Sequence, residues 1–282
     1  MASVLVTGAS SIVARWLVPL LQADGCDLVL VSRSRPAWLA DEAAWVPADL
    51  RGAQWSRNLG APIQTLIHLA PLPLLGHAVA ALEPSGSGRI IAFGTTSRLT
   101  KVESTVAAEQ RMVAEQAAAE DWLARYGASS GARWTLLRPT MIYDGQHDKN
   151  VALIARFIRR FGFFPLIGQA GGRRQPVHAA DLAEACRSVL NNEATFGKTY
   201  NLAGAEVLTY KDMVGRIFAK CGRKPRYVRI PPSLLGAALN MARCLPRYRY
   251  LNAAMAGRMN KDLAFDSADA VRDFGYCPRN FL

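Results

Sequence analysis

Short apolar runs alternate with longer mixed segments through the first half of this chain. Each run is rich in Val, Ile and Leu and is bounded by turn-forming residues, which is typical of strands buried on both faces of a sheet. The longest segment between runs, 104–126, is alanine-rich and predicts a helix that ends at Gly127. This alternation predicts a parallel sheet with helices on both faces. The predicted strands lie at 4–6, 27–31, 65–69, 89–93 and 134–137.

The pattern changes after about Tyr143. Segment 151–161 has the spacing of a basic amphipathic helix. Beyond it, predicted helices at 181–190 and 209–221 flank a predicted strand at 198–202. This change of pattern predicts a second, smaller lobe.

The first predicted strand runs into a glycine turn and then into a helix-like stretch. The sequence VLVTGASSIVARWL has the strand–turn–helix form of a dinucleotide-binding turn. Where such turns space three glycines, this chain has Gly8, Ser11 and Ala14. Gly8 supports the turn, whereas Ser11 takes up some room beside the pyrophosphate and adds a hydroxyl donor. Nucleotide binding is the favoured interpretation, and a turn kept only for folding is the alternative.

These patterns predict an α/β fold, a Rossmann-like doubly wound parallel sheet with a smaller C-terminal substrate lobe. We expect residues 1–145 and 175–204 to form the NAD(P)-binding domain. Residues 146–174 and 205–282 are expected to form the substrate-binding lobe. Ligands should bind at the carboxyl ends of the strands, between the two parts.

Composition narrows the class of protein. The 282 residues are half apolar, and no apolar run reaches the roughly 18 residues that a membrane span needs. The five cysteines lie far apart without a C-x-x-C pair, so we expect no metal site and a reduced, cytoplasmic location. The net charge is +12. No recognised nucleic-acid motif accompanies that charge, so we expect no nucleic acid partner.

Seven segments, in chain order, together carry a resemblance to a known family. They are VTGASSIVARWLVPLL (6–21), Ala48-Asp49-Leu50, IHLAP (67–71), LLRPTMIYDG (136–145), RRQPVHAADLAEA (173–185), YNLAG (200–204) and DFGYCPR (273–279). The chain resembles the extended and atypical branches of the short-chain dehydrogenase/reductase superfamily, of the epimerase/dehydratase type. The stretch FIRRFGFFPLIG (157–168) is similar to the atypical subgroup containing the NDUFA9-type accessory subunit of respiratory complex I.

The resemblance implies a set of cofactor contacts. In the family, the glycine turn lies against the diphosphate, the "GDL" segment meets the adenine, and the loop after the fourth strand lies along the cofactor. Carried over to this chain, the implied cofactor-binding residues are Gly8, Ser10, Ser11, Ile12, Asp49, Leu50, Leu69, Ala70, Pro71, Arg111, Pro139 and Ile142.

The residues after the second predicted strand bear on the choice of cofactor. An Asp or Glu at this place binds the adenosine ribose hydroxyls and selects NAD. This chain reads Ser-Arg-Ser-Arg at 32–35 and has no acid there. Arg33 and Arg35 can clamp a 2′-phosphate, so NADP is favoured over NAD. Two exposed loop arginines are the alternative.

The family's chemistry uses a Tyr-x-x-x-Lys pair on the long helix, and the tyrosine passes a proton while hydride moves. Aligned on this helix, the chain has Ala107 and Arg111. Alanine cannot transfer a proton, and Arg111 keeps a positive charge near the ribose but stays protonated. The candidate catalytic residues are therefore Arg111, Thr96 as the expected Ser/Thr member, and Tyr143 as a substitute acid. Capping by Thr96 and a structural role for Tyr143 are the alternatives.

Arg174 stands where the family has an arginine that grips the diphosphate of a nucleotide sugar. A loop arginine in a generally basic protein is the alternative. Thr96 and Asn150 complete the implied substrate-binding residues. One predicted function is nicotinamide-dependent epimerase, dehydratase or reductase chemistry on a nucleotide sugar or a similar small molecule. The other is a non-catalytic NADP-binding structural or regulatory subunit. The absence of the tyrosine favours the second function or an unusual form of the first.

Basic and aromatic residues gather on the predicted helix at 151–161. Helical spacing places Arg156 beside Arg159 and Arg160, with Phe157 and Phe161 on the same segment. This composition suits a peripheral contact with an anionic membrane or with an acidic partner protein. A solvated basic face is the alternative. A second copy of the chain, forming a homodimer, is another partner that the sequence leaves open.

Overall fold

The chain folds into two compact units, which we describe separately. The computed structural model describes all residues except 1–2, 42, 53–54, 60–61, 83–87, 232 and 234–257. The first unit comprises 1–139, 179–202 and 266–277, and the second comprises 140–178, 203–265 and 278–282.

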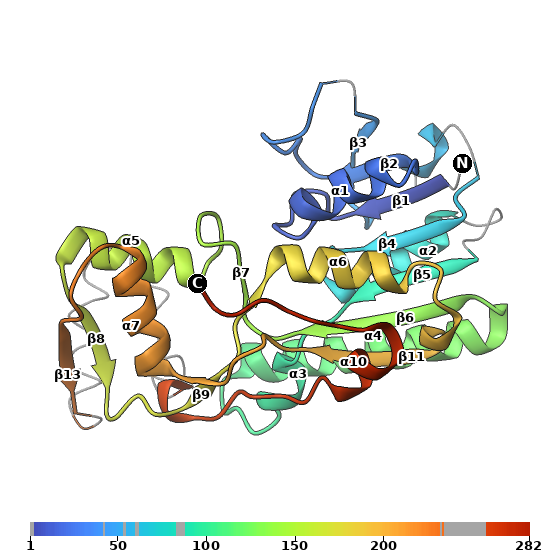
Figure 1. Cartoon of the computed structure of the whole chain (residues 1–282). Coiled ribbons are helices and arrows are strands. Elements are labelled where there is room, and N and C mark those ends of the chain that lie inside the picture. Colours follow the sequence, from blue (N-terminus) through green and yellow to red (C-terminus); the bar gives the residue numbers. More distant parts are fainter. Residues whose placement is uncertain are drawn as a thin grey trace. The chain divides into compact units, whose positions relative to one another are not determined.

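A seven-stranded parallel sheet forms the centre of the first unit (Figure 1). Its strands follow the order β11-β6-β5-β4-β1-β2-β3. The strand order therefore reverses between β1 and β4, and ligands of such sheets bind at the carboxyl ends beside the reversal. The predicted Rossmann-like α/β fold is confirmed. The strands are β1 (Ser3–Thr7), β2 (Asp27–Ser32), β3 (Trp45–Pro47), β4 (Thr65–His68), β5 (Arg89–Phe93), β6 (Arg133–Pro139) and β11 (Lys198–Leu202).

Helices cover both faces of this sheet (Figure 1). On one face, apolar residues of the sheet pack against Leu75 and Val79 of one helix and Leu123 of another, all at most 2% exposed. A separate pair of helices, α1 and α6, pack against each other. The first unit contains α1 (Ala14–Ala23), α2 (Leu75–Leu82), α3 (Ser97–Thr100), α4 (Ala107–Ser130), α6 (Ala179–Val189) and α10 (Ala268–Phe274).

Helix α4 runs past its predicted end at Gly127. It ends at Ser130, and the next residue, Gly131, adopts the left-handed conformation with φ +74°. Gly127 lies inside the helix because Trp134 packs against it, and a Cβ there would lie 2.3 Å from Trp134 Cδ1. The glycine that ended the helix in the sequence prediction is therefore a packing site.

A buried arginine holds the start of β5. Arg89 is 6% exposed, and its guanidinium donates to Leu190 O at 3.0 Å, Val189 O at 2.6 Å and Thr135 Oγ1 at 2.8 Å. Its face lies 4.6 Å from the centre of the Phe196 ring. Burial lowers the pKa of Arg89 to about 10. The side chain thus stays charged at neutral pH and joins β5 and β6 to the end of α6.

Residues 266–277 belong to the first unit, whereas the predicted division placed all of 205–282 in the second lobe. The reason is an ion-pair cluster that the sequence pattern does not reveal. The Asp273 carboxylate accepts hydrogen bonds from Lys198 Nζ at 2.8 Å, Tyr200 OH at 2.7 Å and Arg272 Nε at 2.8 Å. These bonds lower the pKa of Asp273 and join α10 to β11.

The second unit has its own apolar core. Two amphipathic helices, α5 and α7, pack against each other and share buried residues such as Ile158 and Phe218. Among its described residues the unit also contains three two-stranded sheets. Its elements are β7 (Ile142–Tyr143), α5 (Val151–Phe161), β8 (Phe164–Ile167), β9 (Arg173–Arg174), β10 (Val177–His178), β12 (Leu208–Thr209), α7 (Tyr210–Lys220) and β13 (Tyr227–Ile230).

Candidate functional site

The turn between β1 and α1 is built around Gly8, where both the backbone conformation and the close packing oppose a side chain. Gly8 has φ +75°, and a Cβ there would lie 2.4 Å from Ala70 N and 2.6 Å from Leu69 C. Its own N–H donates to Val31 O at 2.8 Å. The turn therefore packs directly against the backbone that follows β4, which leaves the first turn of α1 at the carboxyl end of the sheet.

Ser11, which stands where a glycine was expected, is part of this turn. Its N–H donates to Gly8 O at 2.9 Å, and its Oγ accepts from Ala14 N at 3.1 Å. The hydroxyl hydrogen of Ser11 remains available to an acceptor. Backbone N–H groups at a helix N-terminus attract phosphate, and the dipole of the helix favours negative charge there. With exposed Ser10 and half-buried Ile12 beside it, the turn fits a dinucleotide diphosphate.

A buried histidine fixes the loop that follows β4. His68 Nδ1 lies 2.8 Å from Thr7 Oγ1, and Nε2 lies 3.2 Å from Pro71 O. Burial lowers the pKa of His68 to about 4, so the ring is neutral at physiological pH. Leu69 and Ala70, two of the predicted cofactor contacts, lie between these anchored positions and are half-buried.

The two arginines after β2 differ in their surroundings. Arg35 donates to Ala40 O at 2.6 Å and Asp41 O at 2.9 Å, and it lies over the Trp45 ring at 5.6 Å. Arg33 is exposed and forms no ion pair within the described part of the chain. Arg33 is therefore the more available of the two cations.

In the segment that is expected to meet the adenine, Asp49 is exposed and Leu50 is buried. Asp49 has a side chain 54% exposed and accepts a hydrogen bond from Arg51 N at 3.0 Å. Leu50 is 6% exposed and packs in the core of the first unit. Asp49 is thus open to a ligand, whereas Leu50 can offer only its backbone.

The positions of the absent Tyr and Lys lie at the start of α4. Ala107 is the first residue of that helix, Arg111 follows one turn later, and both are exposed. Thr96 is 5% exposed, and its hydroxyl donates to Pro139 O at 3.1 Å, so its proton is already engaged. Of the three predicted catalytic residues, Arg111 and Thr96 lie in the first unit. Neither offers a proton of suitable acidity.

An ion triad around the buried Glu120 joins α3, α4 and β6 in the first unit. Arg138 donates to Glu120 through Nε at 2.9 Å and Nη2 at 2.5 Å, and Arg98 Nε lies 3.0 Å from the same carboxylate. Glu120 is 7% exposed. The sequence analysis missed this triad. The one signal for it in the sequence is the Arg-Pro pair at 138–139. Arg138 joins the triad at the end of β6, and the next residue, Pro139, accepts the hydrogen bond from Thr96.

Two predicted site residues of the second unit, Tyr143 and Asn150, contact neighbours within that unit. The Tyr143 ring is 2% exposed and meets the rings of His178 at 5.1 Å and Phe281 at 5.0 Å, both edge-on. Asn150 is exposed, and its Nδ2 donates to Ile142 O at 3.4 Å. These contacts give Tyr143 a packing role in the second unit.

Arg174 has a guanidinium that is already committed to backbone oxygens. It is 3% exposed, and it donates to Arg173 O and Lys261 O, each at 2.7 Å, and to Arg258 O. It also lies over the Tyr210 ring at 5.4 Å. A diphosphate would have to displace these bonds, so the structure favours a structural role for Arg174.

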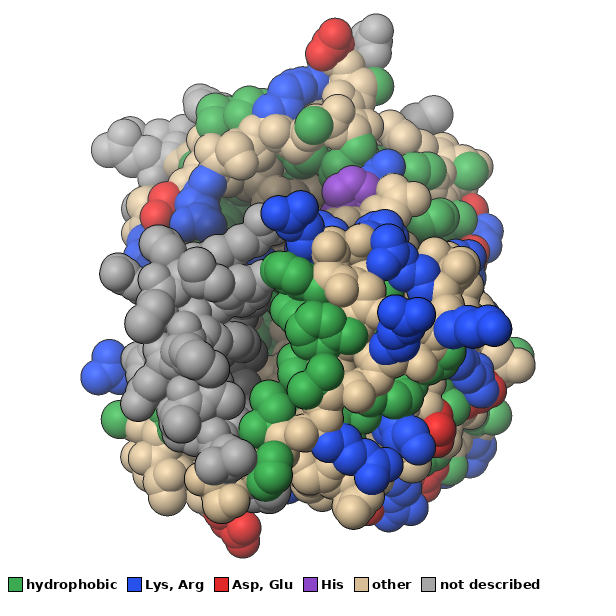
Figure 2. Space-filling model, turned by 90° about the vertical axis from the view of Figure 1, so that its left-hand side faces the viewer, with side chains coloured by type: hydrophobic (Ala, Val, Ile, Leu, Met, Phe, Trp, Pro, Cys, Tyr) green, Lys and Arg blue, Asp and Glu red, His purple; other side chains and the backbone are tan. Residues whose placement is uncertain are grey.

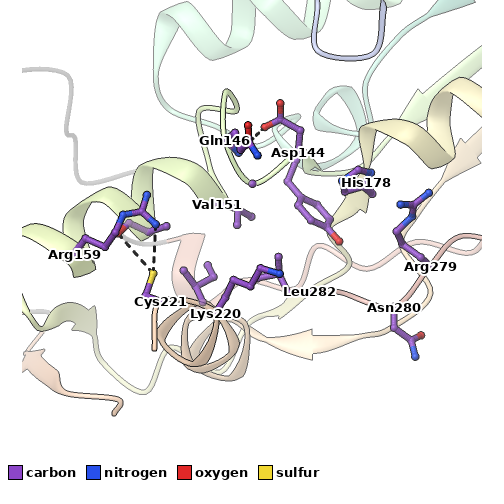
Figure 3. A pocket seen from close by; sticks show the side chains of 14 residues that line it. Asp144, Gln146, Val151, Arg159, His178, Lys220, Cys221, Arg279, Asn280 and Leu282 are labelled. Atoms are coloured by element: carbon purple, nitrogen blue, oxygen red, sulfur yellow. Dashed lines mark hydrogen bonds between the residues drawn. The ribbon is translucent and has the colours of Figure 1, made fainter. Parts of the chain in front are cut away.

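A pocket of about 350 Å³ lies within the second unit (Figure 3). Helices α5 and α7 supply Arg159 and Lys220, and the loop after β7 supplies Asp144. Tyr143 and His178 line the same space. No group of three or more His, Cys, Asp or Glu side chains that could hold a metal occurs within the described residues.

Residues 92–203 match the family model described as the NAD dependent epimerase/dehydratase family. That match covers 112 of the 282 residues. A relative from Arabidopsis thaliana, named NADH dehydrogenase (ubiquinone) 1 alpha subcomplex subunit 9, mitochondrial, is 33% identical over 156 residues. That match covers 55% of this chain and 36% of the relative, so the chain spans about a third of that relative's length. The resemblance drawn from the seven segments is confirmed.

Solved structures of an epimerase and a dehydratase share the fold of this chain. UDP-glucose 4-epimerase of Thermus thermophilus, in complex with NAD, has a TM-score of 0.68 and 21% identity, and the match covers 81% of this chain and 86% of that chain. DesIV, a dTDP-glucose 4,6-dehydratase of Streptomyces venezuelae with NAD and TYD bound, has a TM-score of 0.75 and 17% identity. That match covers 99% of this chain and 92% of that chain.

Exposed aromatic and basic side chains lie at the end of α5 in the second unit. Figure 2 shows hydrophobic side chains gathered on one face with Lys and Arg side chains beside them. Phe161 is 46% exposed, its ring lies 4.6 Å from Phe157 and 6.3 Å from Phe163, and Arg160 lies over it at 6.0 Å. Within the described residues, no helix is both long and apolar enough to cross a membrane. The predicted contact with an anionic partner stays a prediction.

Proposed function

We propose that this epimerase/dehydratase domain binds a nicotinamide dinucleotide, with NADP preferred, and holds it as a structural or regulatory group without ordinary turnover. The fit of the cofactor rests on the β1–α1 turn. Gly8 leaves no room for a side chain, and Ser11 keeps a hydroxyl hydrogen for a phosphate oxygen. Bound there, the dinucleotide would supply a hydride donor or acceptor, and Arg33 would meet its 2′-phosphate.

The observation that carries the non-catalytic role is the surface at the start of α4. Ala107 offers no proton, the Arg111 guanidinium does not release one, and the Thr96 hydroxyl donates to Pro139 O. The names of two relatives support the same proposal. The proteins from Arabidopsis thaliana and Dictyostelium discoideum are both named as a subunit of NADH dehydrogenase.

The test separates binding from turnover. Energy transfer from protein to nicotinamide measures the dissociation constants of NADPH and NADH, and loss of nicotinamide absorbance measures oxidation with ketones, aldehydes and nucleotide sugars. We expect binding with turnover far below about 1 per second, the lower end of ordinary enzyme rates. Turnover at or above that rate would overturn the non-catalytic role, whereas the absence of dinucleotide binding would overturn the proposal as a whole.

A nucleotide-sugar enzyme with a substitute acid is the second candidate. It is supported by the family and by Tyr143, a phenol that lines the pocket of the second unit. If nucleotide-sugar turnover appears and Tyr143→Phe abolishes it while dinucleotide affinity is unchanged, Tyr143 is the acid. Turnover that survives this substitution excludes that role.

A further inference from the structure

Two stretches of this chain carry basic residues and no acidic ones, and the fold of the second unit brings them together. No Asp or Glu occurs in 149–180 or in 213–231, although the chain contains 22 acidic residues. The first stretch includes α5 and β8, and the second includes most of α7 and β13. Strands β8 and β13 pair along their length. The positive charge of both stretches therefore gathers on one part of the second unit.

The segment after α7 lies directly against the last turn of α5. Arg223 Nη2 donates to Arg159 O at 3.0 Å, and Arg223 Nη1 lies 3.3 Å from the position that a Cβ on Gly162 would take. Further cations at this junction are exposed, and they form no ion pair with any residue that the structure describes. They are Arg156 and Arg160 on α5, and Lys224 and Arg226 after α7.

An aromatic ring lies exposed among these cations. Phe161, the last residue of α5, is 46% exposed. Its ring lies 4.6 Å from the ring of Phe157 and 6.3 Å from that of Phe163. Figure 2, which faces the side where Figure 1 shows α5, β8 and β13, has hydrophobic side chains with Lys and Arg beside them. We call Phe161, Phe163 and the four exposed cations the aromatic and basic surface on α5.

The positive charge and the exposed ring together favour a lipid surface over other anionic partners. Arginines attract anionic headgroups, and an exposed ring can enter the boundary between headgroups and acyl chains. A nucleic acid would instead stack a base on the face of the ring. The Arg160 guanidinium lies over the Phe161 ring at 6.0 Å, and Phe157 packs beside it, so the ring is poorly placed for stacking.

The dipole of α5 is the simplest other explanation for the charge. Basic residues in the last turn of a helix interact favourably with its C-terminal end, which accounts for Arg160. It does not account for Lys224 and Arg226, which lie outside that helix, or for the exposed ring of Phe161. These three residues point to a contact with a partner.

We propose that the aromatic and basic surface on α5 docks the protein on a membrane that contains anionic lipids. The Phe161 ring enters the interface, and the four cations lie among the lipid headgroups. Salt screens this attraction, so the docking is reversible. All of these residues belong to the second unit. The proposal therefore stands independently of the dinucleotide, which we assign to the first unit.

Entry of the ring into the bilayer is tested with the full chain and two tryptophan variants. Phe161→Trp places the reporter on the surface, and Val271→Trp, the matched control, replaces a 53% exposed residue of the first unit. Phosphatidylcholine vesicles with brominated acyl chains, with or without phosphatidylserine, quench a tryptophan that enters them. Measured as the difference from the unaltered protein, we expect extra quenching for Phe161→Trp alone, and only when phosphatidylserine is present.

The contribution of charge is tested by two matched double variants. Arg160→Gln with Arg226→Gln removes two charges from the surface, whereas Arg125→Gln with Arg133→Gln removes two exposed charges from the first unit. A cation close to an anionic membrane raises the partition coefficient about fivefold. We therefore expect the first pair to weaken binding to phosphatidylserine vesicles about 25-fold, and the control pair to change it less than about twofold.

Four results would overturn the proposal. They are no binding of the unaltered protein to phosphatidylserine vesicles at low salt, no extra quenching of Phe161→Trp relative to Val271→Trp, equal weakening by the two double variants, and tighter binding to single-stranded RNA than to the vesicles. The last result, if the Arg160 and Arg226 variant also weakens it, would assign the surface to a nucleic acid.

Discussion

The Thr7 hydroxyl donates to Nδ1 of His68 at 2.8 Å, so the last residues of two neighbouring strands are joined by side chains as well as by the sheet. Pro71 O can only accept a hydrogen bond, and therefore Nε2 carries the ring proton that it donates at 3.2 Å. Both nitrogens of the neutral ring are thereby used. The loop they hold is the one that Gly8 approaches, so two independent contacts position it.

Protonation of His68 should loosen this loop at acid pH. The folded-state pKa of about 4 lies below the ordinary histidine value of 6.5. The neutral ring therefore adds stability that is fully present above about pH 6.5 and is lost as the pH falls through about 4. The difference corresponds to about 3 kcal/mol. Urea unfolding between pH 4 and 7 measures it, and His68→Gln, which does not titrate, should flatten this part of the pH dependence. An unchanged slope in that variant would contradict the assignment.

Gly8→Ala should destabilise the first unit and weaken NADPH binding. The substitution combines a left-handed backbone with a Cβ placed 2.4 Å from Ala70 N, and we expect a loss of about 2–4 kcal/mol. Gly25→Ala is the matched control, because Gly25 has φ +73° but nothing within 4 Å of its Cβ position. It should cost only about 1 kcal/mol. Equal losses in urea unfolding would show that the close approach to Ala70 is unimportant.

Arg33→Ala should reduce the preference for NADPH. We expect NADPH binding to weaken by about 1.5–3 kcal/mol, the scale of a hydrogen bond to a charged group, with little change for NADH. Arg33→Lys keeps the charge without the paired donors and should fall between the two. Energy-transfer titrations give all the dissociation constants. The expectation fails if both dinucleotides weaken equally, or if the unaltered protein binds NADH more tightly.

Arg89→Met should be among the most damaging substitutions in the first unit. It removes the donors to Leu190 O and Val189 O and leaves Val189 O with the longer 3.5 Å bond from Thr195 Oγ1, at a cost of about 3 kcal/mol or more. Arg133→Met is the control, because its exposed side chain also lies over Phe196, at 5.4 Å. Thermal unfolding should show a loss under about 1 kcal/mol for that control.

The aromatic and basic surface on α5 should bind anionic membranes. We expect the protein to sediment with phosphatidylserine vesicles at low salt and to be released at high salt, because arginines attract the surface charge and Phe161 offers an apolar contact. Phe161→Ser should lose this binding, whereas Val271→Ser, which alters a 53% exposed valine of the first unit, should keep it. If sedimentation does not depend on lipid charge or on salt, the membrane contact is excluded and the basic residues form only a solvated face.

The sheet could be predicted from the sequence because its strands are short, continuous apolar runs. The runs at 27–31 and 65–69 coincide closely with β2 (Asp27–Ser32) and β4 (Thr65–His68). The turn at Gly8 could also be predicted, because a glycine between a strand and a helix usually marks a backbone conformation that other residues avoid. These features depend on local pattern, which a single sequence displays directly.

Features that depend on partners distant in the chain could not be predicted. Nothing near Arg174 indicates that its guanidinium binds the carbonyls of residues 258 and 261. Likewise, nothing near Asp273 indicates that Lys198 and Tyr200 lie beside it. A family motif fixes where such a residue stands, but tertiary packing decides whether its charge is available to a ligand.

The return of residues 266–277 to the first unit has a consequence during synthesis of the chain. Strand β11 joins the sheet only after residue 202 is made, and Asp273 can bind Lys198 only after a long intervening stretch has followed. Until then β6 presents an open edge to other nascent chains. Contacts of such long sequence separation form slowly. Protein made in cells should therefore depend on chaperones or low temperature for its yield more than its final stability would suggest.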